Sequence, residues 1–212
     1  MRQSAFQFAA AAALAFLFVA PAGLVAQAAA TPPALPELQS ALRDLWMGHI
    51  FWVRNVVFMS RAGNTAAAGV AEKQVVQNAR AIADAISPFY GQPAADKLFG
   101  LLAVHYGAIK EYMGAAFGGK KAAKTAASDK LDANADEIAA FLSSANPNWP
   151  KDTLDDALRA HAAHHEMQID DVVARDYKAE ADSWNEMKTH IETIADVLAQ
   201  GIEKQFGSGG QG

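Results

Sequence analysis

Apolar residues recur at intervals of three and four along almost the whole chain from about Leu38 onward. This spacing puts them on one face of an α-helix, whereas a half-buried strand would show strict alternation of apolar and polar residues. The sequence contains no such alternating run and no Asn-Gly hairpin signal. It therefore predicts an all-α fold, an up-and-down antiparallel bundle of four to six helices.

Gly, Pro and Asn divide the pattern into six helical segments. We expect these helices at residues 38–61, 65–86, 94–117, 128–143, from 152 or 153 to about 175, and 176–206. The basic, Ala-rich residues 120–127 are expected to form a connector or a loose helix start. Residues 38–206 are predicted to form one helical-bundle domain, followed by a disordered Gly-rich tail at 207–212.

The N-terminus has the pattern of a secretory signal peptide at residues 1–28. Arg2 supplies a positive charge, residues 5–20 are apolar except for Gln7, Pro21 breaks the run, and small residues lead to Ala28. An uncleaved anchor is the less favoured alternative, because the run is short for a membrane span of about 20 residues. We expect a periplasmic or secreted protein of about 182–184 residues, with a tether at 29–37 and no stable membrane insertion.

Charge and cysteine content narrow the possible functions. The chain has 18 Lys and Arg against 23 Asp and Glu, and it has no Cys. An acidic exported chain without a basic cluster is not expected to bind nucleic acid. Disulfides, thiolate metal sites, iron–sulfur clusters and covalently attached haem are excluded, so a metal site would need nitrogen, oxygen or thioether ligands.

Histidines lie near the midpoints of four of the predicted helices: His49, His105, the group His161, His164 and His165, and His190. Midpoints share one level in an up-and-down bundle, whichever way each helix runs. A buried imidazole costs roughly 1–3 kcal/mol for each unmet nitrogen, and one metal ion would satisfy several rings at once. We therefore predict a buried histidine cluster that binds a divalent transition metal ion, namely zinc, iron, manganese or copper.

The fifth predicted helix offers more than one ligand. His161 shares a helical face with His164 and His165, which follow it by three and four residues. Two of these three rings could chelate one ion, and the spacing leaves open which two. Glu186 precedes His190 by four residues and could be a ligand or could orient that imidazole. The predicted ligands are thus the six histidines and Glu186, in a pattern unlike the H-E-x-x-H motif of metalloproteases.

Three further polar residues are predicted near the same level as contacts of a bound cofactor: Arg54, Asn78 and Asp136. Arg54 follows His49 by five residues and could pair with Asp136, with Glu186 or with a bound anion. Methionines admit copper as a specific alternative, although methionine at helical spacing usually fills a core. Noncovalent haem ranks below a bare ion, because one haem needs only two opposed histidines.

These observations predict a metal-binding protein for binding, storage or sensing. One alternative is a structural or interaction bundle whose histidines form a polar core without metal. A second is a non-haem metal redox enzyme, which would need open coordination positions. The sequence contains no serine nucleophile elbow, phosphate loop or nucleotide fingerprint. Whether the protein is an enzyme, and its oligomeric state, are left open by the sequence.

From Leu45 onward the chain resembles a bacterial family of small helical-bundle proteins, a resemblance that implies the fold and carries no activity with it. The matching stretches are LWMGHIFWVR at 45–54, PFYG at 88–91, LLAVH at 101–105, NADEIAAFL at 134–142, NPNW at 146–149, His190, ADVL at 195–198 and GIEKQF at 201–206.

The resemblance implies that a set of polar residues occupies motif positions of the family: His49, Arg54, Asn78, His105, Asn134, Asp136, His190 and Asp196. The motif histidine of the fifth helix matches either His161 or His164. Gly48 and Ala81 stand where acidic residues are usual in the family. If those acids complete a metal shell in relatives, this chain has lost oxygen ligands and would hold a different ion or none.

Overall fold

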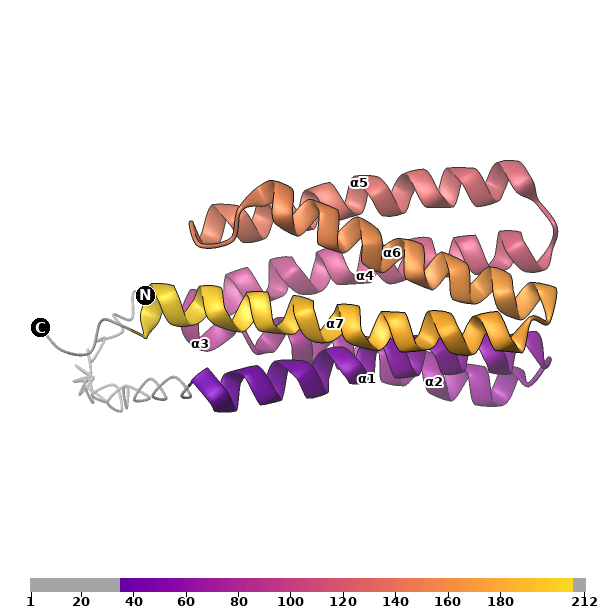
Figure 1. Ribbon diagram of the computed structural model, residues 1–212, viewed down its shortest axis with the longest axis horizontal. Coiled ribbons are helices and arrows are strands. Elements are labelled where there is room, and N and C mark those ends of the chain that lie inside the picture. The colour runs from indigo at the N-terminus through magenta and orange to yellow at the C-terminus, as the bar shows by residue number, and fades with distance from the viewer. Residues whose placement is uncertain (1–34, 208–212) are drawn as a thin grey trace, which may run out of the picture.

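The computed structural model describes residues 35–207, which form a bundle of antiparallel helices (Figure 1). The predicted signal peptide, most of the tether and residues 208–212 lie outside the described residues. The all-α prediction is confirmed for residues 35–207, which contain six long helices and one short one. They are α1 (Leu35–Arg61), α2 (Thr65–Asp84), α3 (Ser87–Tyr90), α4 (Gln92–Phe117), α5 (Lys121–Ala145), α6 (Lys151–Ala174) and α7 (Tyr177–Phe206).

Two helix boundaries differ by more than two residues from those expected. Helix α5 begins at Lys121, so the segment expected as a connector or a loose helix start is helical. Alanine has the highest helix propensity, and this turn is also held by tertiary contacts, since Ala127 is buried and Lys124 pairs with Asp170. Helix α1 begins at Leu35, so the last part of the expected tether is its first turn.

The long helices form three consecutive hairpins, α1–α2, α4–α5 and α6–α7, in which equivalent residues are separated by 56 positions. The interval of 56 relates the sets His49, His105 and His161; Asn78, Asn134 and His190; Leu42, Leu98 and Leu154; and Ile82, Ile138 and Ile194. The chain is therefore built as an approximate threefold repeat of one helical hairpin.

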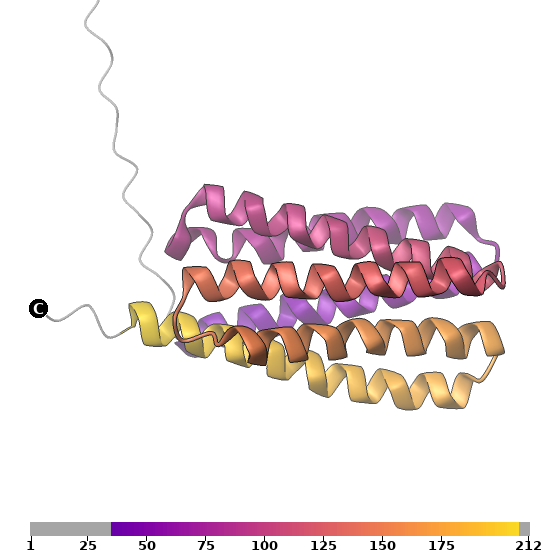
Figure 2. The ribbon, with the colours of Figure 1, turned by 90° about the horizontal axis from the view of Figure 1, so that it is seen from above.

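Packing follows the same repeat. The first helix of each hairpin packs against the second helix of the preceding hairpin: α4 on α2, α6 on α5 and, closing the ring, α1 on α7. Helix α6 also contacts α1 and α4 across the ring. Figures 1 and 2 show the six long helices side by side along one axis. We call α1, α4 and α6 the inner helices and α2, α5 and α7 the outer helices.

The tight turn of each hairpin places one residue in the left-handed backbone region, again at equivalent positions. These residues are Gly63 with φ 73°, Gly119 with φ 65° and Arg175 with φ 61°. Glycine adopts this conformation without the steric cost that a Cβ atom brings. The sequence thus meets the backbone requirement at two turns and carries some strain at the third.

Two hydrophobic clusters fill the bundle. The larger contains Trp46, Leu102 and Leu158, and the smaller contains Val53 and Ile109. On each inner helix the histidine of the repeat lies between these two levels, so a polar layer divides the apolar core.

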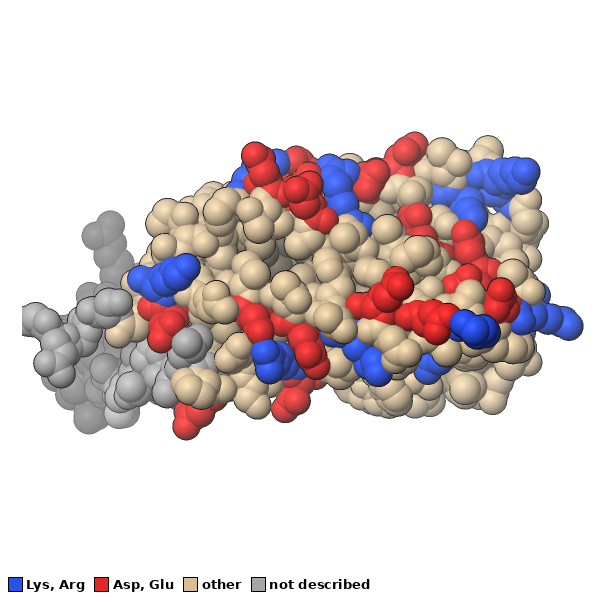
Figure 3. Space-filling model, in the orientation of Figure 1, with Lys and Arg blue, Asp and Glu red and all other residues tan. Residues whose placement is uncertain are grey.

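The surface carries charges of both signs. On the face of Figure 3, acidic and basic side chains are interspersed over the helices. Ion pairs join neighbouring hairpins, for example Lys110 with Glu72 and Lys124 with Asp170. None of the helices within residues 35–207 combines the length and apolar character that crossing a membrane requires.

Candidate metal centre

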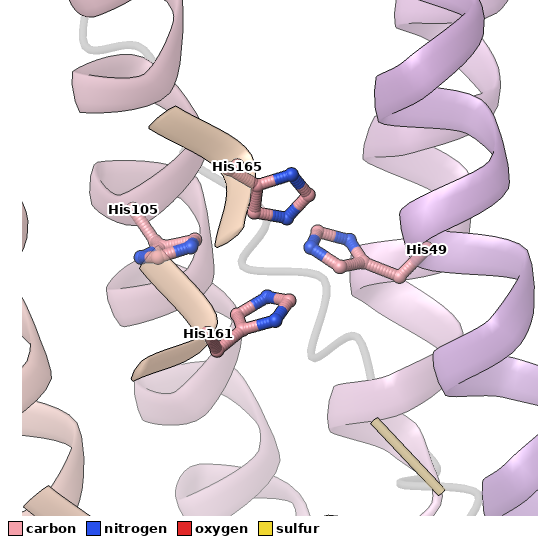
Figure 4. Close-up of side chains that lie close together, drawn as sticks. All are labelled: His49, His105, His161 and His165. Carbon is pink, nitrogen blue, oxygen red and sulfur yellow. The ribbon is translucent and has the colours of Figure 1, made fainter. Parts of the chain in front are cut away.

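Four histidines from three helices meet inside the bundle (Figure 4). His49 comes from α1, His105 from α4, and His161 and His165 from α6. Each offers one ring nitrogen such that these four atoms all lie within 4.8 Å of one another. It is the one group of three or more His, Asp or Glu side chains with such an arrangement in the described part of the chain. We call it the histidine cluster.

The rings are buried and face one another. The four side chains are from 1% to 5% exposed. The His161 and His165 ring centroids are 4.6 Å apart, and those of His105 and His161 are 5.7 Å apart. Because His165 follows His161 by four residues, α6 projects both from one face toward the centre of the bundle. Three histidines at equivalent repeat positions and a fourth one turn further along α6 make up the cluster.

Most ring nitrogens in the cluster lack a protein partner. Both nitrogens of His105 and both of His161 are buried without a hydrogen bond to another protein atom. The same holds for Nδ1 of His49 and Nε2 of His165. An unmet buried polar group costs about 1–3 kcal/mol, so this layer is costly unless something binds the rings.

Burial keeps the cluster neutral. Desolvation, with the nearby His105 as a smaller cause, lowers the pKa of His49 to about 3. Desolvation also lowers the pKa of His105 to about 4, and the adjacent Asn134 side chain opposes part of that shift. The pKa values of His161 and His165 are lowered well below their ordinary value by burial and then by the neighbouring histidines. Neutral imidazole is the form that coordinates a metal ion.

The outer helices support the cluster through three equivalent hydrogen bonds. Asn78 Nδ2 donates to the Leu45 carbonyl at 2.9 Å, and Asn134 Nδ2 donates to the Leu101 carbonyl at 3.2 Å. Each of these carbonyls belongs to the residue four positions before a cluster histidine, on the inner helix. The outer helices are therefore tied to the inner helices at the level of the cluster.

His190 is the third member of this set. Its Nε2 donates to the Ala157 carbonyl at 2.9 Å, four residues before His161. Its ring centroid lies 6.5 Å from that of His161, outside the four-membered cluster. The structure thus places His190 as a counterpart of Asn78 and Asn134, with one ring nitrogen already committed to the backbone.

His164 and Glu186 lie further out. The His164 ring is 5.3 Å from His190 and is half-buried, while Glu186 is exposed on α7. Burial and then the nearby His190 lower the pKa of His164, and the Glu186 charge opposes this. Of the seven predicted ligands, the structure therefore brings together His49, His105, His161 and His165, and places the other three at the edge.

The three predicted cofactor contacts also take other places. Arg54 Nε donates at 2.5 Å to Glu180, whose side chain is 3% exposed. The Arg54 guanidinium also lies 4.9 Å from the Trp184 ring centroid. Asp136 is half-exposed and pairs with Lys151 on the surface. Asn78 lies near the level of the histidine cluster, but its side chain donates to the Leu45 backbone carbonyl. Glu180 was not predicted, because an acid in the first turn of a helix is ordinary.

Several motif residues meet at one end of the bundle instead. Tyr90 packs against Trp149 and Phe206, with ring centroids 5.8 Å and 5.2 Å away. Asn146 Nδ2 donates to the Tyr90 hydroxyl, which donates to Gln205. These residues hold the loops and the C-terminal turn together, which gives them a structural role apart from the cluster.

The signal that separates His190 from the cluster is present in the sequence as the 56-residue interval, which pairs it with Asn78 and Asn134. The position of a histidine near the midpoint of its helix does not by itself separate His190 from the cluster histidines. Comparisons of the chain with protein-family models, with curated proteins and with solved structures give no match. The chemistry of the site therefore rests on its own geometry.

Proposed function

We propose that this protein is an exported metal-binding protein that holds one transition metal ion through His49, His105, His161 and His165. The observation that carries the proposal is a set of four buried, neutral imidazoles whose ligand atoms lie within 4.8 Å of one another. Metal storage, delivery or sensing is the class of function that such a site supports without further reactive groups. Export is supported by the pattern of residues 1–28.

The spacing of the four nitrogens suits a small ion. Metal–nitrogen bonds of about 2.0–2.1 Å in a tetrahedron put the ligand atoms about 3.3 Å apart. Ring nitrogens already within 4.8 Å of one another reach that spacing when side-chain rotation moves each of them by the order of 1 Å. An ion at the centre would also use nitrogens that are otherwise buried without partners.

The donor set narrows the choice of ion. Imidazole suits zinc, copper, iron and nickel, whereas carboxylate and carbonyl oxygens suit magnesium, calcium and manganese. The cluster consists of imidazoles alone, so we propose zinc or copper, with iron as the third choice and manganese disfavoured. Four neutral ligands leave the charge of the ion uncompensated in the core, which favours an ion of low charge or a bound hydroxide.

Elemental analysis of native, untagged protein purified without chelators tests this proposal. We expect about one metal ion per chain. His105→Ala is expected to abolish metal retention while helicity is largely kept. His164→Ala is the matched control, because His164 lies next to His165 on α6 and outside the cluster. A folded protein without metal that also fails to take up zinc or copper would overturn the proposal and favour a polar histidine core.

A further inference from the structure

A cavity of about 130 Å³ lies inside the bundle, in the larger hydrophobic cluster. All three hairpins contribute to it at equivalent positions of the repeat. Its wall includes the triplets Leu42, Leu98 and Leu154 from the inner helices and Ile82, Ile138 and Ile194 from the outer helices. Most of the other lining residues come from α6 and α7, among them Thr153, His190 and Thr193. The cavity therefore lies among the three hairpins and nearest to the third.

No polar atom contributes to the accessible wall of this cavity. Water needs two to four hydrogen-bond partners to occupy a buried site, so this space is unfavourable for water. An engineered apolar cavity of about 150 Å³ in another protein stays dry and binds benzene or xenon. The present cavity is close to that size and has the same kind of wall.

The repeat is broken at one position of the cavity wall. Leu45 and Leu101 occupy the position that Ala157 takes in the third hairpin, and of these three residues Ala157 lines the cavity. Alanine has three side-chain carbon atoms fewer than leucine, so a larger side chain at position 157 would extend into the cavity. Trp149 also lines the cavity and packs closely against α7 at Gly201, where a Cβ atom would lie only 1.9 Å from its Nε1.

Trp46 links the cavity to the histidine cluster. Its side chain lines the cavity, and its ring centroid lies 6.0 Å from that of His49 and 6.2 Å from that of His161, edge-on to both. A molecule in the cavity would therefore touch the side chain that packs directly on two cluster histidines.

We infer that this cavity binds one small, uncharged, nonpolar molecule of up to about the size of benzene. Shape and dispersion contacts select the ligand, since Thr153, His190 and Thr193 line the cavity without exposing a polar atom to it. The site does not require a metal ion, and Trp46 makes it a place from which a ligand can alter the packing around the cluster.

Benzene is the probe, applied to metal-free protein at neutral pH and followed by ligand-induced thermal stabilisation and by displacement of xenon in ¹²⁹Xe NMR. We expect saturable binding of benzene, and binding of phenol weakened about tenfold or more because its hydroxyl group would be buried without a partner. Equal binding of the two probes would contradict the inferred wall, and no saturable binding of benzene would overturn the site.

Two cavity-filling variants locate the binding. Ala157→Leu restores the leucine of the other two hairpins, and Ile138→Phe fills the space from another wall; each is expected to abolish benzene binding. Ala103→Leu, on the exposed face of α4, is the matched control and should bind like the parent. Unchanged binding in a folded filling variant would overturn the location. Because the assay uses metal-free protein, its outcome is separate from that of the metal analysis.

Discussion

His190 and Asn78 make the same hydrogen bond in different hairpins. Each donates at 2.9 Å to the inner-helix carbonyl that lies four residues before a cluster histidine: Ala157 in one case and Leu45 in the other. The two residues are 112 positions apart, two intervals of the repeat. Their side chains act as cross-links between outer and inner helices, and this role accounts for a buried or partly buried polar side chain at that position in every hairpin.

His190→Asn is the substitution that the repeat suggests, and we expect it to leave the metal content unchanged. The asparagine side chain can keep the bond to the Ala157 carbonyl, as Asn134 does with Leu101. His190→Ala removes the bond and is expected to lower the free energy of unfolding by about 1 kcal/mol. Metal analysis and denaturant unfolding measure the two effects, and loss of metal in His190→Asn would show that His190 is itself a ligand.

His165→Ile should separate the metal site from the fold. The equivalent residues Val53 and Ile109 are each 2% exposed, so the position accepts an aliphatic side chain. Replacing a buried imidazole that has an unpartnered nitrogen should stabilise the metal-free protein by about 1–2 kcal/mol. Metal affinity should fall at least tenfold, because three nitrogen ligands remain. Unfolding of the chelated protein and competition with a chromophoric chelator measure these changes; unaltered affinity would exclude His165 as a ligand.

The stability of the metal-free protein should decrease as the pH falls below about 6.5. Burial lowers the pKa of His49 to about 3 and that of His105 to about 4, whereas both side chains titrate near 6.5 when the chain is unfolded. Between these values the unfolded state binds more protons, so acid favours unfolding. At about pH 4.5 each of these rings is expected to cost about 3 kcal/mol.

Denaturant titrations across this pH range test the prediction, with His165→Ile as a variant that has one buried ring fewer. The stability of that variant should depend less steeply on pH than that of the parent. Identical slopes would contradict the view that the cluster is buried and neutral. Bound metal should shift the loss of stability to lower pH, because protons and metal compete for the same nitrogens.

Arg175→Gly is expected to stabilise the protein by about 0.5–1 kcal/mol. Arg175 is exposed and adopts φ 61°, where the other two hairpins have glycine. The gain is smaller than the full cost of a left-handed residue, because glycine loses more entropy on folding. Gly63→Ala is the reciprocal control: a Cβ atom there would meet no heavy atom within 4 Å, so a loss of stability would report backbone strain alone. Thermal unfolding measures both, and a destabilised Arg175→Gly would contradict the strain.

The fold could be predicted because its signal is local. The three-and-four spacing of apolar residues and the turn residues between segments determine which stretches are helical and which face is buried. The sequence leaves residues 120–127 open between a connector and a helix start, because nothing local distinguishes the two in a basic, Ala-rich segment. The pairing of Lys124 with Asp170, 46 residues away, holds that turn.

The convergence of His49, His105, His161 and His165 could be anticipated in part. Helix midpoints indicate the level of a side chain along the bundle, but not whether its ring reaches the centre or remains at the rim. His190 and His164 share the level of the cluster and still lie outside it, since His190 is bonded to a carbonyl and His164 is half-buried beside it.

The sequence by itself determined the helices, their apolar faces, the absence of thiolate ligands and the 56-residue interval that relates the three hairpins. Only the tertiary structure decided which imidazoles meet, that Arg54 pairs with Glu180, and that an apolar cavity remains beside Ala157. Periodicity is a property of neighbouring residues on one helix. Rotation and depth of each helix in the ring depend on how side chains of all six helices pack together, and no single segment contains that information.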